Sequence, residues 1–94
     1  MFLHLGHNLS VRASEVVAIH DYALFAPGGV NRPLFERVQA EGRIADVTGG
    51  KRPRALVITT DTVYISAISH TTLLRRTQNL YTFVRKNAKT TGNS

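Results

Sequence analysis

The clearest hydrophobic pattern in the chain is a pair of short apolar runs separated by three polar residues. Residues 55–59 (ALVIT) and 63–68 (VYISAI) are rich in β-branched and apolar side chains, which are typical of strands. The intervening Thr60-Asp61-Thr62 is too short for a crossover connection, so the two runs are predicted to pair as an antiparallel hairpin. We take this hairpin as the centre of the predicted fold.

Three further apolar runs precede the hairpin. Residues 2–5 (FLHL), closed by Gly6, predict a short edge strand, and residues 16–19 (VVAI) are continuous and β-branched enough to predict a central strand. Residues 44–48 predict one more short strand before the Gly49-Gly50 bend. The pattern therefore favours a sheet built from most parts of the chain.

A helix is predicted to begin at Asn31-Arg32-Pro33, because proline at the first helical position loses no hydrogen bond. Apolar residues recur at helical spacing through Val38, and Gly42 is well placed to end the helix. On the other face, Arg32 with Glu36 and Arg37 with Glu41 stand four residues apart. Such spacing is typical of solvent-exposed ion pairs rather than of catalytic carboxylates.

A second helix is predicted after the hairpin, where the hydroxyls of residues 69–72 can cap a turn containing Leu73 and Leu74. Together the elements predict one α+β domain (α/β in the broad sense) over residues 1–78, with a twisted, mostly antiparallel sheet and two helices. Residues 79–94 are predicted to form a helical extension and a disordered basic tail, because residues 87–94 contain hardly any apolar side chains.

Composition narrows the function classes. The 94 residues are 43% hydrophobic, which fits a single small globular domain. No run approaches the roughly 20 apolar residues of a membrane span, and MFLHLGHN lacks the basic and apolar regions of a signal peptide. The absence of cysteine excludes disulfides and thiolate chemistry. The expected location is the cytoplasm, in association with the nucleoid.

Charge is strongly segregated along the chain. Residues 1–50 contain four basic and five acidic residues, whereas residues 51–94 contain eight basic residues and one acid, Asp61. The net charge of +6 therefore arises from the second half of the chain. Such segregation costs self-repulsion, which a polyanionic partner would relieve.

Candidate chemistry is concentrated at Gly49-Gly50-Lys51-Arg52. Glycines allow the backbone to approach an anion closely, and the two cations can bind a phosphate. A nucleotide-binding P-loop is excluded, since Arg52 stands where the Mg²⁺-binding Ser or Thr is required. His4 and His7 lack the further ligands of a metal site. We expect no enzyme activity, no cofactor, no metal and no small-molecule substrate.

Binding to the backbone of double-stranded DNA requires only several cations on one face. The predicted contact residues are Lys51, Arg52, Arg54, Arg12, Arg75 and Arg76. Two alternatives remain, an interaction module whose basic face docks an acidic protein and an RNA-binding protein. A small core with strand edges to cover also favours a homo-oligomer, which would multiply the basic patch.

Residues 34–76 (LFERVQAEGRIADVTGGKRPRALVITTDTVYISAISHTTLLRR) resemble the extracellular matrix regulatory family of small bacterial DNA-binding regulators, the RemA/RemB type. Residues 2–6 (FLHLG) and 11–21 (VRASEVVAIHD) look most like the RemB-type branch. The resemblance implies a compact fold that assembles into a ring with basic loops on its rim. DNA would wrap around this ring, as at promoters of biofilm matrix genes.

The resemblance also assigns individual residues. The family's paired arginines fall here on Lys51 and Arg52, so one is changed with its charge kept. A third DNA-contacting arginine of the RemA type falls on Glu15, whose carboxylate would repel a phosphate. Either Arg12 replaces that arginine, or this branch binds DNA more weakly or differently.

Overall fold

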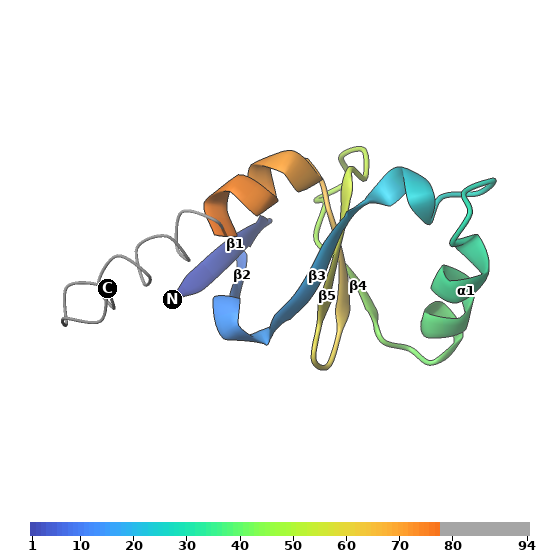
Figure 1. The fold of residues 1–94 in the computed structure, drawn as a ribbon, viewed down its shortest axis with the longest axis horizontal. Helices are drawn as coiled ribbons and strands as arrows, with labels where there is room; N and C mark the ends of the chain where they lie inside the picture. Colours follow the sequence, from blue (N-terminus) through green and yellow to red (C-terminus); the bar gives the residue numbers. More distant parts are fainter. Residues whose placement is uncertain (78–94) are drawn as a thin grey trace, which may run out of the picture.

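The computed structural model describes residues 1–77, which form an α+β domain of three layers (Figure 1). A four-stranded sheet lies in the middle, with a separate β-hairpin and the C-terminal helix on one side and α1 on the other. The strands are β1 (Phe2–Gly6), β2 (Leu9–Arg12), β3 (Val16–Asp21), β4 (Ile44–Asp46), β5 (Ala55–Thr59) and β6 (Val63–Ser66). The helices are α1 (Arg32–Ala40), the 3₁₀ turns η1 (Ala13–Glu15) and η2 (Tyr22–Leu24), and a helix over residues 70–77.

The predicted central hairpin is confirmed. Strands β5 and β6 pair antiparallel, with Leu56 opposite Ile65 and Val57 opposite Tyr64. The sheet has the order β3-β5-β6-β4, in which β4 and β6 are parallel and the other neighbours antiparallel. The predicted α+β class and mostly antiparallel sheet are therefore confirmed, and residues 44–46 of the predicted 44–48 strand form β4.

The predicted central position of residues 16–19 is wrong. These residues belong to β3, which lies at an edge of the sheet and pairs only with β5 among the described strands. None of its side chains is fully buried, and Val17 is 66% exposed. Their β-branched composition correctly indicated a strand, but composition does not determine how many neighbours a strand has.

Residues 2–5 form a strand as predicted, within β1, but β1 belongs to a separate two-stranded sheet with β2. The turn between them places His7 and Asn8 at φ 45° and 63°, as a two-residue hairpin turn with positive φ at both positions requires. Strand β2 was not predicted, because LSVR is short and His-Asn is an uncommon pair for such a turn. This hairpin packs against the sheet through buried Leu3 and Leu5.

The core has two parts because successive side chains of a strand point to opposite faces. From β5, Ala55 and Val57 join the cluster beneath the β1–β2 hairpin and the 70–77 helix, whose Leu73 is fully buried. Leu56 points the other way and packs with Phe25 and Phe35 beneath α1. The central hairpin thus supplies side chains to both halves of the core.

Helix α1 begins at Arg32 with proline in its first turn and is followed by Gly42 at φ 73°, as predicted. The predicted pair of Arg32 with Glu36 is present, with 3.5 Å between Nε and Oε2. The predicted pair of Arg37 with Glu41 is wrong, because Gly42 turns the chain back and carries Arg43 to Glu41. The distance between Arg43 Nη2 and Glu41 Oε1 is 2.8 Å.

The second helix begins at residue 70 and contains Leu73 and Leu74 as predicted. The predicted hydroxyl cap is that of Ser69, whose Oγ accepts from the Thr72 N–H over 3.2 Å. No helix within residues 1–77 has the length and apolar character to cross a membrane. The predicted extension and tail over residues 79–94 lie outside the described residues.

Candidate nucleic-acid interface

The loop between β4 and β5 carries three of the predicted contact residues, and it begins with a defined turn. The Asp46 carboxylate accepts hydrogen bonds from the Thr48 N–H (2.8 Å) and from the Thr48 hydroxyl (2.7 Å). Gly49 and Gly50 follow at φ 64° and 84°, and the Lys51 N–H closes the turn onto Thr48 O over 3.2 Å. Glycine is favoured at both positions because side chains rarely adopt such φ values.

The hydrogen bonds from Thr48, first from its side chain and then from its backbone, hold the pKa of Asp46 below its ordinary value. The carboxylate is therefore charged at neutral pH, and its Oδ1 accepts both of these hydrogen bonds. A β-carbon on Gly49 would lie 3.2 Å from His7 Nδ1, so this turn also sits closely against the β1–β2 turn.

The end of the loop is hydrogen-bonded to the end of β6 and to the start of η2. The Arg54 N–H donates to Ser66 O over 2.8 Å, and Arg54 O accepts from the Tyr22 N–H over 3.1 Å. Because Ala55 pairs with Ser66, the residues that precede β5 and those that follow β6 leave the sheet at the same end. The condition for a shared basic surface, that the loop and the helix start lie together, is met.

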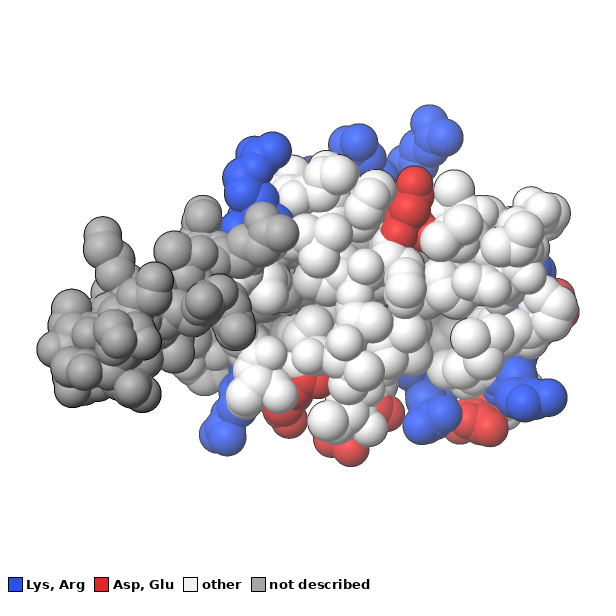
Figure 2. Space-filling view, in the orientation of Figure 1, with Lys and Arg blue, Asp and Glu red and all other residues white. Residues whose placement is uncertain are grey.

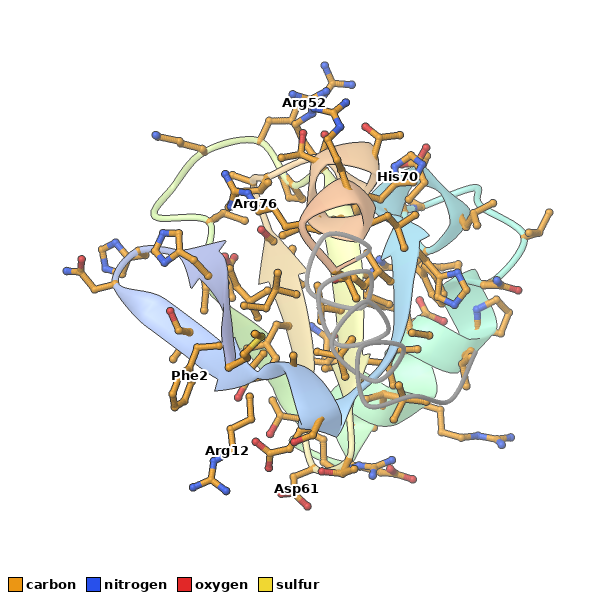
Figure 3. The ribbon with its side chains drawn as sticks, turned by 60° about the vertical axis from the view of Figure 1, so that its left-hand side comes forward. Phe2, Arg12, Arg52, Asp61, His70 and Arg76 are labelled. Atoms are coloured by element: carbon orange, nitrogen blue, oxygen red, sulfur yellow. The ribbon has the colours of Figure 1, made fainter. Side chains whose placement is uncertain are left out.

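We call this surface the basic end and define it as Lys51, Arg52, Arg54, Arg75 and Arg76. All five side chains are exposed, and none forms an ion pair with a residue in the described part of the chain. Figure 2 shows Lys and Arg along the upper side of the molecule, and Figure 3 places Arg52 and Arg76 on it. The basic end is therefore a surface of exposed cations that have no ion-pair partner among residues 1–77.

Two acidic residues lie at the same end of the sheet, and the carboxylate of each accepts a hydrogen bond from a backbone N–H. The carboxylate of Asp21 accepts from the Ala23 N–H over 3.1 Å, and that of Asp46 accepts from Thr48 as described above. Neither carboxylate forms an ion pair with a described arginine or lysine. The cations of the basic end are therefore not neutralised by these acids.

An open hollow of about 650 Å³ lies beside the basic end. Arg52 and Arg54 line one part of it, Asp21 and Tyr22 another, and the half-buried His70 lies at the start of the second helix. His70 was not among the predicted residues, and only its position directly after a capping serine could have indicated it. The hollow extends the basic surface with polar groups.

Arg12 lies away from the other five predicted residues. Strand β2 leads through η1 to Val16, which pairs with Thr59 at the opposite end of the sheet from Ala55. Figure 3 shows Arg12 and Asp61 both at that end, far from Arg52. Glu15 lies there too, since its carbonyl accepts from the Thr60 N–H over 3.1 Å. Within one chain, Arg12 and Glu15 therefore do not share a surface with the basic end.

Comparison with known proteins gives a match to the family described as extracellular matrix regulatory protein A-like, RemA-like, over residues 2–77. This match spans most of the chain. The chain belongs to this family. It is also 28% identical over 81 residues to extracellular matrix regulatory protein B of Bacillus subtilis (strain 168), covering 86% of this chain and 95% of that protein. The predicted RemA/RemB-type resemblance is confirmed.

Proposed function

We propose that this RemA-like protein is a bacterial, non-enzymatic transcriptional regulator that binds the backbone of double-stranded DNA through its basic end. The observation that carries the proposal is the gathering of five exposed, unpaired cations from two distant parts of the chain. Guanidinium and ammonium groups of this kind bind phosphates and release counterions from DNA. Membership in a family named for extracellular matrix regulation supports matrix genes as targets.

The shape of the basic end favours phosphate contacts over base readout. Lys51, Arg52 and Arg54 extend from a loop, and Arg75 and Arg76 from the exposed side of a helix that packs onto the sheet through Leu73. A recognition helix, in contrast, must enter the major groove and place several side chains against the base edges. Contacts to the phosphates contribute affinity that depends little on the base sequence.

Assembly of several copies would strengthen such binding. A single basic end offers five cations, whereas linked copies present theirs together and raise the overall affinity without new contacts per copy. Strand β3, which lies unpaired on its outer side within residues 1–77, and the exposed apolar side chains support a homo-oligomer. We propose a cytoplasmic, nucleoid-associated assembly, and a ring is the form that the sequence resemblance implies.

The test is fluorescence anisotropy of a labelled duplex with variants of the basic end. Lys51→Ala/Arg52→Ala removes two phosphate contacts from each copy, so the log–log salt slope should fall by about 2 for each copy bound. The single variant Arg52→Ala is matched with Arg37→Ala, which removes an equally exposed cation from α1. We expect Arg52→Ala to weaken binding to all duplex sequences equally and Arg37→Ala to leave it nearly unchanged.

An equal loss of duplex affinity in Arg52→Ala and Arg37→Ala would show that only the net charge of the protein matters. That result would contradict a defined interface. Loss confined to one duplex sequence would mean that bases are read. Stronger displacement by A-form RNA than by B-form DNA would favour an RNA-binding protein. Binding to an acidic protein that added duplex does not displace would favour the interaction module.

A further inference from the structure

The outer face of the β1–β2 hairpin carries an exposed aromatic ring beside an exposed cation. Phe2 is 66% exposed, while its neighbours Leu3 and Leu5 point inward and are buried. Arg12 stands directly opposite Phe2 in the register of the hairpin, and its side chain is also exposed. We call Phe2 and Arg12 the hairpin knob.

On the other face of the sheet, a groove of about 200 Å³ opens between α1 and strands β4–β6. Its apolar lining includes Leu34, Phe35, Val38, Ile44, Ile58 and Val63. Leu34 is 48% exposed there, and Asp61 contributes a carboxylate to the lining. We call this feature the α1 groove. It is an apolar pocket with one acid.

The knob and the groove are complementary in chemistry. The ring of Phe2 would bury apolar surface in the groove, and Arg12 beside it would meet the carboxylate of Asp61. Neither Arg12 nor Asp61 forms an ion pair with any residue from 1 to 77. Both lie at the end of the sheet opposite the basic end (Figure 3).

The two features cannot meet within one chain. The hairpin packs on one face of the sheet through Leu5 and Val57, whereas α1 packs on the other face through Phe35 and Leu56. The full thickness of the sheet therefore separates the knob from the groove, as Figure 1 shows for β1 and α1. A second copy of the chain can supply the missing half of each contact.

We propose that the protein assembles head to tail, with Phe2 of one copy in the α1 groove of the next and Arg12 paired with that copy's Asp61. This inference rests on the homo-oligomer of the proposed function and specifies its interface. A contact between two different surfaces repeats from copy to copy and closes into a ring if the rotation between copies allows it. Because both halves of the contact lie away from the basic end, every copy keeps its five cations free for DNA.

Charge reversal provides the decisive experiment, with the mass of the assembly measured by size-exclusion chromatography and light scattering. Arg12→Asp places two carboxylates in the contact, and Asp61→Arg places two cations there, so each variant alone should lose its large assembly. The double variant R12D/D61R restores opposite charges and should assemble again. A mixture of the two single variants should also assemble, because each contact then joins opposite charges.

The apolar half of the contact is tested separately with Phe2→Ser. The protein concentration needed for assembly should rise at least tenfold in this variant. Its melting temperature should not fall, because the Phe2 side chain is mostly exposed within one chain. Val30→Ser is the matched control, since Val30 is 80% exposed and lines neither the knob nor the groove. It should assemble like the unaltered chain.

Several results would overturn the proposal. Assembly that survives both charge reversals would point to pairing along the free edge of β3. Assembly that Phe2→Ser leaves unchanged would mean that another segment, such as residues 78–94, fills the groove. Loss in both single variants without recovery in the double variant or the mixture would refute the Arg12–Asp61 pair.

DNA binding distinguishes failure of this inference from failure of the proposed function. Dispersed Arg12→Asp should still bind duplex, with a smaller salt slope, because its basic end is intact. Lys51→Ala/Arg52→Ala should remain assembled but bind duplex more weakly than the unaltered chain. If both variants bind DNA like the unaltered chain, the proposed function fails whatever the assembly state.

Discussion

Through one buried hydroxyl, Ser66 joins the β1–β2 hairpin, the central sheet and the segment that leads to the second helix. Its side chain is 0% exposed, its Oγ–H donates to Leu5 O over 2.6 Å, and its Oγ accepts from the Ile68 N–H over 3.0 Å. These bonds attach the β1–β2 hairpin to the central sheet and direct the chain toward the second helix. A buried polar group of this kind stabilises only while both partners are present.

Ser66→Ala should lower the free energy of unfolding by about 1–3 kcal/mol, because Leu5 O would be left buried, and the Ile68 N–H half-buried, without the serine hydroxyl as partner. For a domain of this size, the melting temperature should fall by at least about 4 °C. Calorimetry checks this, with Ser10→Ala on exposed β2 as the control. An equal effect of the two substitutions would show that the Ser66 hydroxyl has no special role.

Sequence could identify the cations of the basic end, because charge is visible without structure. It could not identify the role of Ser66, since the bonded Leu5 lies 61 positions away and the serine sits in an apolar run. The sequence-based prediction also grouped Arg12 with the five residues of the basic end, although β2 places Arg12 at the opposite end of the molecule. Residue type was predictable, whereas proximity depended on the path of the chain.

At the scale of elements, the β4–β5 loop depends on one charged side chain. Asp46 fixes the turn that positions Lys51 and Arg52, and its lowered pKa shows that the fold favours its ionised form. A carboxyl group with a lowered folded-state pKa stabilises the fold above its unfolded pKa, and this contribution disappears as the pH falls through the folded-state pKa.

Asp46→Ala should therefore lower the free energy of unfolding by roughly 1 kcal/mol at pH 7 through loss of its two hydrogen bonds. The difference from the unaltered protein should begin to shrink near the unfolded-chain pKa of about 4 and should disappear as the pH falls through the lower folded-state pKa of Asp46. Urea denaturation at several pH values measures both effects. Asp46→Asn, which keeps one acceptor oxygen, should lose less, and a difference independent of pH would contradict the account.

Elements with local partners were predictable, and those with distant partners were not. Three residues separate β5 from β6, so their pairing followed from chain connectivity alone. Strand β3 pairs with β5 across more than thirty residues, and nothing in VVAI indicates that its other edge stays open. The starts of both helices were predictable because their signals are local: proline lies in the first turn of α1, and Ser69 caps the second helix.

The whole molecule separates its chemistry between two ends. The basic end carries five exposed cations without an ion-pair partner among residues 1–77. The opposite end combines Arg12 and Asp61 (Figure 3) with Glu15, whose carbonyl accepts from the Thr60 N–H. One end is suited to a polyanion and the other to contacts between copies. The excess charge of residues 51–94 indicated the partner class from sequence, but the division between ends became visible only once the path of the chain placed Arg12 at the end opposite the β4–β5 loop.

The most direct test of the central claim is the salt dependence of duplex binding by the unaltered protein, measured by fluorescence anisotropy at several salt concentrations. Each phosphate contacted should contribute about 0.9 to the log–log slope, so full use of one basic end predicts a slope of about −4.5. A steeper slope would show that several copies engage one duplex. The absence of binding at low salt, or affinity that does not change with salt, would contradict the account.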